Sequence, residues 1–234
     1  MKHKKVKISA LMLLGIGLTA INAQTVTDIG GNVYKTESFG TQVWMVENLK
    51  TTKFQDSTDI PMVNFNNTWA ALKVPAYCWN NNDETANKNT FGSLYNWYAV
   101  NTNKLCPTGW HVPTDNEWAI FTNYLIKNGN GYEGVKINIA KSMAATSGWT
   151  TSEKVGTVGN DQASNNKSGF NGIPGGSRSF NGTFGGIGGE GAWWSSSGFS
   201  NYVAWLRCLD YSKRILYRAY LDKRFGMSVR CVKD

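Results

Sequence analysis

The chain has 234 residues, of which 41% are apolar, 13% aromatic and 17% charged. This composition supplies enough apolar side chains for a packed core and too little charge for an intrinsically disordered protein, so we expect a folded domain. The 24 basic and 16 acidic residues give a net charge of +8, but four of the lysines lie within the first seven residues.

The first 23 residues have the pattern of a secretory signal peptide. A basic start is followed by an apolar stretch over residues 8–21 and then by Asn22 and Ala23. The rival interpretation is a transmembrane anchor, but about 14 apolar residues fall short of the roughly 20 that cross a bilayer. No cysteine precedes Cys78, so a lipid anchor at the cleavage site is excluded. The sequence therefore predicts one mature domain over residues 24–234, secreted to the extracellular space or periplasm, without an integral membrane segment.

Loss of the signal peptide would lower the net charge to +4, since 20 basic residues would remain against 16 acids. No run of the remaining basic residues resembles a nucleic-acid-binding arm, and a secreted protein rarely meets nucleic acid. We therefore expect no nucleic-acid partner.

Turn signals near the N-terminus predict a β-meander. Residues 30–32 separate two short runs of β-branched and aromatic residues, and Gly40 precedes a further run over residues 42–46. Residues 50–90 are rich in Asn, Thr and Asp without clear periodicity, so we expect mostly loop there. Residues 94–100 form a short apolar run that fits either a helix or a buried strand.

The strongest helix signal begins at Thr114. Thr114 and Glu117 have the spacing of a capping box, in which each side chain bonds a free amide at the helix start. Apolar side chains then recur with helical periodicity from Trp118 to Leu125, and an Asn-Gly pair follows. The pattern predicts a helix over residues 115–127.

Residues 148–198 contain 14 glycines without a fixed period. Aromatic residues are spread through this stretch, and they bury too much area to remain in solvent, so we expect an irregular but packed loop region. Within this stretch, residues 172–178 are glycine-rich, as a phosphate-binding loop is, but they lack the lysine and the following helix that such a loop needs. Beyond the glycine-rich stretch, turn-forming residues separate residues 202–209, 215–221 and 227–232, which predicts a closing β-meander.

The four cysteines are Cys78, Cys106, Cys208 and Cys231. An even number in an oxidising compartment favours disulfides, and three connectivities are open at this point. Zinc binding is the rival interpretation, but His111 is the only histidine after residue 23 and the thiols are widely spread. We therefore expect two disulfides and no metal site.

The residues offer no convincing catalytic set. His111 is the sole candidate base for a Ser-His or Cys-His mechanism, and its Trp-His-Val-Pro context favours a structural role. The pairs Asp83 with Glu84 and Asp115 with Glu117 are explained by solvated charge and helix capping. We therefore expect a protein that is not an enzyme.

Five ordered blocks of the chain resemble the Fibrobacter succinogenes major paralogous domain family. The resemblance covers nearly all of the chain after residue 23, and it implies no established activity. The blocks are residues 40–49, 94–100, 105–113, 193–196 and 226–232.

Two segments are also similar to the C-type lectin-like fold, in particular to the branch of formylglycine-generating enzymes. Residues 111–118 look like the loop-to-helix entry of that branch, and residues 226–230 look like its closing strand. The similarity implies an α+β, C-type lectin-like fold. Such a fold has a twisted antiparallel sheet, two or so flanking helices and a long irregular loop region, here the Gly-rich one.

This fold also implies a disulfide pairing. The entry to the main helix and the closing strand lie near each other in it, so the resemblance pairs Cys106 with Cys231 and leaves Cys78 with Cys208. Closing a loop of over 100 residues contributes roughly 4 kcal/mol to stability by constraining the unfolded chain.

The similarity does not transmit function by itself. Formylglycine-generating enzymes use a copper-binding cysteine pair close in sequence, whereas Cys208 and Cys231 are 23 residues apart; a copper oxidase of this type is the alternative function. Of the three triplets of calcium-dependent sugar binding, two are absent, and residues 79–81 are at best a distorted trace of the third in the wrong part of the chain. Structural calcium in the loop region stays an open alternative through Asp161, Asn165 and Asn166, because hard cations prefer oxygen ligands.

Tyrosine and arginine side chains gather on or beside the turns of residues 201–224, and both are favoured at binding hot spots. The alternative is that half of them pack the sheet and the others are ordinary solvated positions. Related lectin-like folds carry their ligand surface in this part, so we expect a secreted, non-catalytic binding module for an extracellular polysaccharide or a surface protein. A structural component of the envelope is the third option. The candidate ligand-binding residues are Tyr202, Tyr211, Lys213, Arg214, Tyr217, Arg218 and Tyr220.

Overall fold

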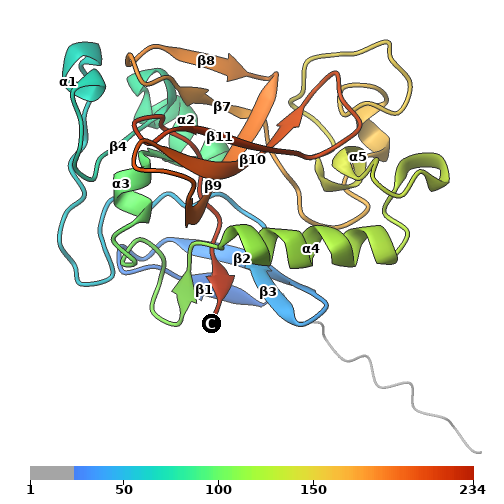
Figure 1. Ribbon diagram of the computed structural model, residues 1–234, viewed down its shortest axis with the longest axis horizontal. Helices are drawn as coiled ribbons and strands as arrows, with labels where there is room; N and C mark the ends of the chain where they lie inside the picture. The colour runs from blue at the N-terminus through green and yellow to red at the C-terminus, as the bar shows by residue number, and fades with distance from the viewer. Residues whose placement is uncertain (1–23) are drawn as a thin grey trace, which may run out of the picture.

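Residues 24–234 form a mixed α+β structure with two five-stranded sheets and one two-stranded sheet. The computed structural model describes these residues (Figure 1), and the predicted signal peptide, residues 1–23, lies outside them. The strands are β1 (Thr25–Thr27), β2 (Val33–Phe39), β3 (Gln42–Met45), β4 (Tyr77–Cys78), β5 (Leu94–Tyr95), β6 (Trp110–His111), β7 (Gly175–Arg178), β8 (Phe184–Ile187), β9 (Glu190–Gly198), β10 (Val203–Asp210), β11 (Tyr217–Asp222) and β12 (Val232–Lys233). The helices are α1 (Asn66–Ala70), α2 (Glu84–Phe91), α3 (Trp97–Val100), α4 (Asp115–Lys127) and α5 (Ala140–Met143), with 3-10 turns η1 (Asn80–Asn82), η2 (Tyr132–Gly134) and η3 (Gln162–Ser164).

The first sheet has the strand order β1-β2-β3-β12-β6. Strands β1, β2 and β3 are antiparallel neighbours, so the predicted N-terminal β-meander is confirmed. Strand β12 lies between β3 and β6, where Val232 pairs with both Trp44 and His111. The C-terminal strand therefore closes the sheet that the N-terminal strands began.

The predicted closing β-meander is correct for β10 and β11 but wrong for its third strand. Met227, Val229 and Cys231 are buried in the core between the two sheets, and β12 itself belongs to the first sheet. Strand β11 has a largely exposed pattern, so a third strand beside it would have left these apolar side chains in solvent. Burial of these three side chains therefore takes residues 227–231 into the core and not along the edge of β11.

The second sheet has the strand order β11-β10-β9-β7-β8. Strands β7, β8 and β9 lie in the stretch that we predicted to be irregular, so that prediction is wrong beyond residue 174. Close backbone approach explains glycine in these strands: a Cβ on Gly191 would lie 2.6 Å from the Ile173 carbonyl oxygen. Residues 148–174, in contrast, contain no regular element except η3, and Phe170 is buried among them, as expected for a packed loop region.

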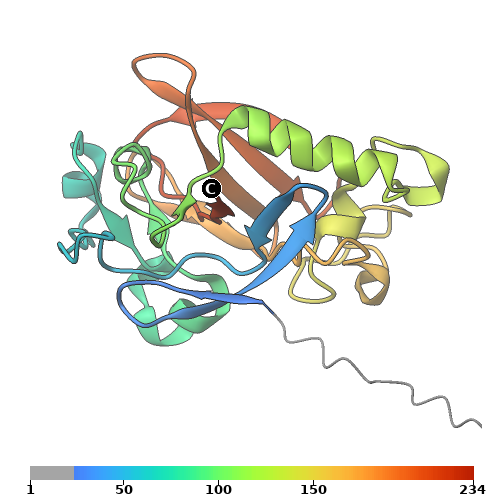
Figure 2. The same cartoon turned by 90° about the horizontal axis from the view of Figure 1, so that it is seen from below.

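Helix α4 has the predicted bounds and lies across the strands of the second sheet, next to the first (Figures 1 and 2). Thr114 accepts a bond from the Glu117 amide at 3.2 Å, and the Glu117 carboxylate accepts one from the Thr114 amide at 2.7 Å. The Trp118 ring packs edge-on against Trp44 of β3 at 4.7 Å between centroids. The capping box thus fixes where α4 starts, and its aromatic face holds it against the first sheet.

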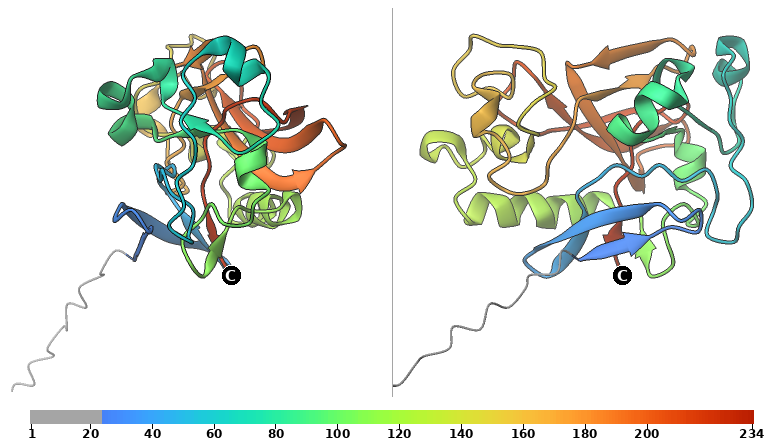
Figure 3. Two further views of the ribbon diagram at one scale, coloured as in Figure 1. Left: turned by 90° about the vertical axis from the view of Figure 1, so that its left-hand side faces the viewer. Right: turned by 180° about the vertical axis from the view of Figure 1, so that it is seen from behind.

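Residues 50–90 are more regular than predicted. They contain α1 and α2, and Asp83 caps α2 by accepting a bond from the Ala86 amide at 3.0 Å. Residues 94–100 contain both of the elements considered, because Asn96 ends β5 and caps α3. Helices α1 to α3 gather at one end of the molecule, and residues 130–174 lie at the other (Figure 3). No helix within residues 24–234 has the length and apolar character to cross a membrane.

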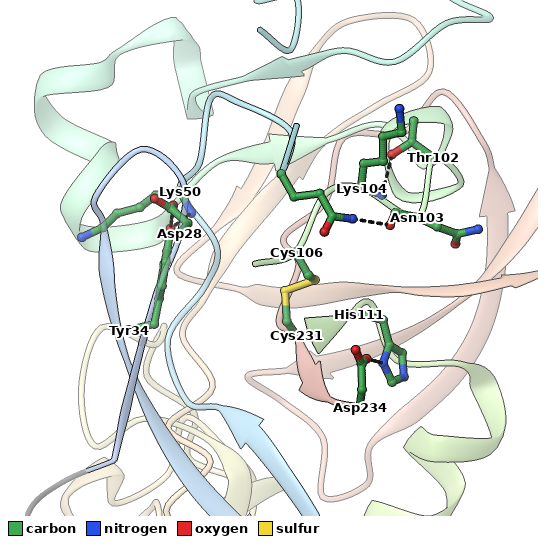
Figure 4. The surroundings of a disulfide bond; sticks show 11 residues. Asp28, Tyr34, Lys50, Thr102, Asn103, Lys104, Cys106, His111, Cys231 and Asp234 are labelled. Carbon is green, nitrogen blue, oxygen red and sulfur yellow. Dashed lines mark hydrogen bonds and ion pairs between the residues drawn. A yellow bond between two sulfur atoms is a disulfide. The ribbon is translucent and has the colours of Figure 1, made fainter. Parts of the chain in front are cut away.

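One disulfide joins Cys106 to Cys231, as the fold resemblance implied (Figure 4). The second predicted pair is wrong, because Cys78 and Cys208 are free thiols. Cys78 lies on β4 in a small cluster beside Arg178, whereas Cys208 lies on β10 and packs against the main core. Burial raises the pKa of each free thiol to about 12, so neither is an activated nucleophile.

Candidate functional site

The seven candidate ligand-binding residues do not form one surface. They are distributed along the hairpin of β10 and β11, in which Val203 pairs with Asp222 at one end and Cys208 with Tyr217 near the other. Tyr202 lies at the open end and Arg218 and Tyr220 on β11, whereas Tyr211, Lys213 and Arg214 lie at the turn and Tyr217 begins β11.

The turn of this hairpin holds the loop region in place. The Tyr211 carbonyl accepts a bond from the Gly159 amide at 2.7 Å, and the Lys213 carbonyl accepts one from Val158 at 3.2 Å. The Arg214 guanidinium donates to the Val155 carbonyl at 2.9 Å. The backbone of Tyr211 and Lys213 and the side chain of Arg214 therefore have a structural role in holding the loop region.

The remaining candidates lead to an exposed group of rings, which we call the aromatic surface: Phe199, Trp205, Arg218 and Tyr220. The Phe199 and Tyr220 rings are stacked, with centroids 4.4 Å apart and planes 7° from parallel. Trp205 meets both rings edge-on, and the Arg218 guanidinium lies over the Trp205 ring at 3.4 Å. Phe199 is 51% exposed and Tyr220 49% exposed.

Asp115, at the start of α4, fixes the cationic side of this surface. Its carboxylate accepts bonds from Arg218 at 2.8 Å and from the buried Arg207 at 2.8 Å. Partial burial raises the pKa of Asp115, but the bonds from Arg218 and Arg207 outweigh it and hold the pKa below its usual value. The carboxylate is therefore ionised at neutral pH and orients Arg218 against Trp205.

Of the aromatic surface, Arg218 and Tyr220 were predicted from the sequence, whereas Phe199 and Trp205 were not. Trp205 stands directly opposite Tyr220 in the register of β10 and β11, and that register is a tertiary property. Asp115 was noticed only as part of a helix cap. The alternation of large aromatics with arginine in residues 205–220 was the one local signal that could have identified the surface.

Tyr202 lies apart from the aromatic surface, beside a shallow groove of about 260 Å³. Tyr98 from α3 and the ion pair of Asp222 with Arg224, 2.7 Å long, also line it. Tyr202 is 78% exposed. The groove therefore lies between Tyr202 and helices α1 and α3.

His111 is held between two carboxylates. Its Nδ1 lies 2.6 Å from Asp234 Oδ1 and its Nε2 lies 2.8 Å from Glu117 Oε1 (Figure 4 shows the Asp234 contact). Partial burial lowers the pKa of His111, but the bonds with Asp234 and Glu117 outweigh it and hold the pKa above its usual value. With both ring nitrogens engaged, the geometry fits a structural clamp between α4, β6 and the C-terminus.

This clamp gives a pH prediction. Below the ordinary histidine pKa near 6.5 the stabilisation by His111 is fully present, and it is lost as the pH rises through the raised pKa of the folded state. We expect the free energy of unfolding to fall as the pH rises above the ordinary histidine pKa and through the raised pKa of the folded state, and His111→Gln to reduce this slope. Urea denaturation across the pH range checks this. An identical slope in the variant would show that the clamp contributes nothing.

Several oxygens of the proposed calcium site already accept hydrogen bonds within the protein. The Lys141 ammonium of α5 donates to the carbonyls of Asn160 and Asp161, the latter at 2.7 Å, and to Asn165 Oδ1 at 2.8 Å. Asn166 uses its Oδ1 to accept the amide of Asn171 at 2.7 Å. The ammonium therefore takes one side-chain oxygen, that of Asn165, and two backbone carbonyls of this group. Among residues 24–234, no three His, Cys, Asp or Glu side chains are grouped to hold a metal ion.

These observations define a mixed α+β domain, closed by one disulfide, that presents a fixed aromatic surface. The chain belongs to the Fibrobacter succinogenes major domain family, which it matches over residues 38–233. The family inferred from the sequence blocks is thus confirmed. No curated protein and no solved structure matches the chain.

Proposed function

We propose that the protein is a secreted, non-catalytic module that binds an extracellular polysaccharide at the aromatic surface. The observation that carries this proposal is the stacked pair of Phe199 and Tyr220, half exposed and braced by Trp205. Exposed apolar patches are rare on soluble proteins unless they bind something. Since the rings are already fixed, a ligand would lose little affinity to ordering them.

A sugar is the ligand that this chemistry suits best. Aromatic rings offer flat apolar faces for the C–H side of a pyranose, and polar groups at their edge can bond its hydroxyls. Arg218 and Asp115 supply both donors and acceptors within the same surface. A protein partner would be expected to bury a larger area.

The finer fold assignment is part of the same proposal. A C-type lectin-like fold is supported by the curled antiparallel sheets, the long loop region and the disulfide from the entry of α4 to the closing segment. The disulfide also supports an oxidising compartment, since such bonds form and persist outside the cytosol. His111, the candidate base in the sequence, bonds two carboxylates, which supports a structural role for this side chain.

A glycan array probed with the purified protein tests the proposal, together with a pull-down from envelope extract. We expect saturable binding to one class of polysaccharide and no turnover of it. Capture of a single envelope protein with an empty array would instead support a protein ligand. Oxygen consumption on a thiol peptide in the presence of Cu(I) would overturn the non-catalytic assignment.

A further inference from the structure

A polar pocket of about 200 Å³ lies on a different part of the molecule, between the first sheet and α2. Its walls come from residues 46–50, the end of α2 at residues 88–92, residues 171–173 and Arg230. The volume corresponds to roughly seven water molecules at about 30 Å³ each. It therefore admits a small anion or one sugar unit, but not a folded partner.

Arg230 is the central feature of this pocket. Its side chain is 1% exposed, and burial lowers the pKa of its guanidinium to about 9, with partial compensation from Glu47. A guanidinium of this pKa still carries its charge at neutral pH. Within residues 24–234 no carboxylate lies within ion-pair distance of it. The Phe170 and Trp193 rings lie 4.2 and 5.4 Å from the guanidinium carbon and offset part of its charge. Buried charges are costly unless they are paired, and this one has no carboxylate in contact with it.

The hydrogen bonds of Arg230 are also incomplete. Its Nε donates to Asn48 Oδ1 at 3.0 Å, one Nη donates to the Phe170 carbonyl, and the other donates to the Asn171 carbonyl at 2.8 Å. A guanidinium has five N–H groups, so two of them have no acceptor in the described chain. All three acceptors are neutral oxygens. A ligand in the pocket that Arg230 lines would supply both the missing acceptors and the missing negative charge.

The rim has the same sign of charge. The Lys50 ammonium donates to the Asn89 side chain, at 3.4 Å, and has no carboxylate partner among the described residues. Lys88 is paired with Glu84 at 2.8 Å outside the pocket, and Glu47 is the one acid in the lining. With Lys88 offset by Glu84, Arg230 and Lys50 against Glu47 leave the pocket a net positive charge, which favours anions.

We propose that this pocket binds an oxyanion of the carboxylate or sulfate type, either free or carried by an acidic sugar unit of a glycan. The inference is independent of the aromatic surface, since no residue is shared between the two sites. Each Nη of Arg230 keeps one unused N–H, and a guanidinium with two such donors can bond the two oxygens of such an anion.

Calorimetric titration of the purified protein tests this inference with three probes at constant ionic strength: digalacturonate, sodium sulfate and a neutral galactose disaccharide. We expect saturable binding of an anionic probe and none of the neutral one. Binding of sulfate would show that a free oxyanion suffices, whereas binding of digalacturonate alone would show that the sugar is recognised with its charge; either result supports the site.

Variants assign the binding to the pocket. Arg230 also holds the Phe170 and Asn171 carbonyls, so the rim residue Lys50 carries the test. Lys50→Met should weaken anion binding about tenfold, whereas Lys53→Met, which removes a neighbouring lysine paired with Asp59 at 2.6 Å, should leave it unchanged. Equal loss in both variants, equal binding of the neutral disaccharide, or no saturable binding at millimolar anion would overturn the proposal.

Discussion

Replacing both disulfide partners, as Cys106→Ala with Cys231→Ala, is expected to lower the free energy of unfolding by about 5 kcal/mol. The bond closes a loop with a sequence separation of 125, so its removal gives the unfolded chain a large amount of conformational freedom. Alanine is preferred to serine as the replacement, because Cys106 and Cys231 are 3% and 0% exposed and serine would bury a hydroxyl at each position. Equilibrium denaturation of the variant and the parent protein measures the difference.

The matched control is the double variant Cys78→Ala with Cys208→Ala. These thiols are free, so this variant loses only side-chain packing, and we expect about 1 to 2 kcal/mol. A thiol titration of the denatured, unreduced protein should find two reactive thiols. No free thiols, together with equal losses in the two double variants, would show that Cys78 and Cys208 are bridged as well.

The second large effect is expected at Lys141. Lys141→Met keeps the length of the aliphatic stem but removes the three donors that hold Asn160, Asp161 and Asn165. Lys141 is 5% exposed, so water cannot easily replace these bonds, and leaving buried acceptors unpaired should cost about 3 kcal/mol in unfolding free energy. Thermal and urea unfolding measure this loss.

Lys167→Met is the control, because the Lys167 ammonium makes one exposed bond to the Gly129 carbonyl, at 2.9 Å. It should change stability by less than about 0.5 kcal/mol. Because the Lys141 ammonium already bonds the Asn165 oxygen and two carbonyls of this region, a chelator should leave the melting temperature of the parent protein unchanged. A fall in melting temperature on chelation that added calcium reverses would contradict this assignment.

Local signals predicted the elements that local bonds fix. The bounds of α4 follow from the reciprocal bonds of Thr114 and Glu117, which are set within one turn of helix. The N-terminal meander follows from tight turns such as the one at Gly31, whose positive φ of 83° suits glycine. The side-chain cap of α2 at Asp83 is also a local signal, but the polar composition of residues 50–90 favoured a loop prediction there.

Long-range contacts fixed what the sequence could not reveal. The strands within the glycine-rich stretch exist because backbones approach closely there, as at Gly191 beside Ile173, and glycine itself has no strand preference. The path of residues 227–232 is set by the burial of their apolar side chains in the core, which is a tertiary property. Similarly, Cys78 and Cys208 remain apart because they belong to different clusters.

Only half of the aromatic surface could be predicted from the sequence, for the same reason. Composition identified a segment rich in tyrosine and arginine, but only the register of β10 and β11 brings Trp205 beside Tyr220. The turn between those strands directs Tyr211 and Arg214 to the loop region instead. Residue type therefore indicated binding chemistry, and pairing decided which residues could take part.

Titration of three variants with the polysaccharide selected on the array tests the central proposal most directly. Tyr220→Ala, which removes half of the stacked pair, should weaken binding at least about tenfold, and Phe65→Ala, at another ring that is 79% exposed, should not. The double variant Tyr211→Ala with Arg214→Ala should also bind normally if it remains folded. Unchanged affinity in Tyr220→Ala, or a loss confined to the Tyr211 and Arg214 variant, would contradict a binding site at the aromatic surface.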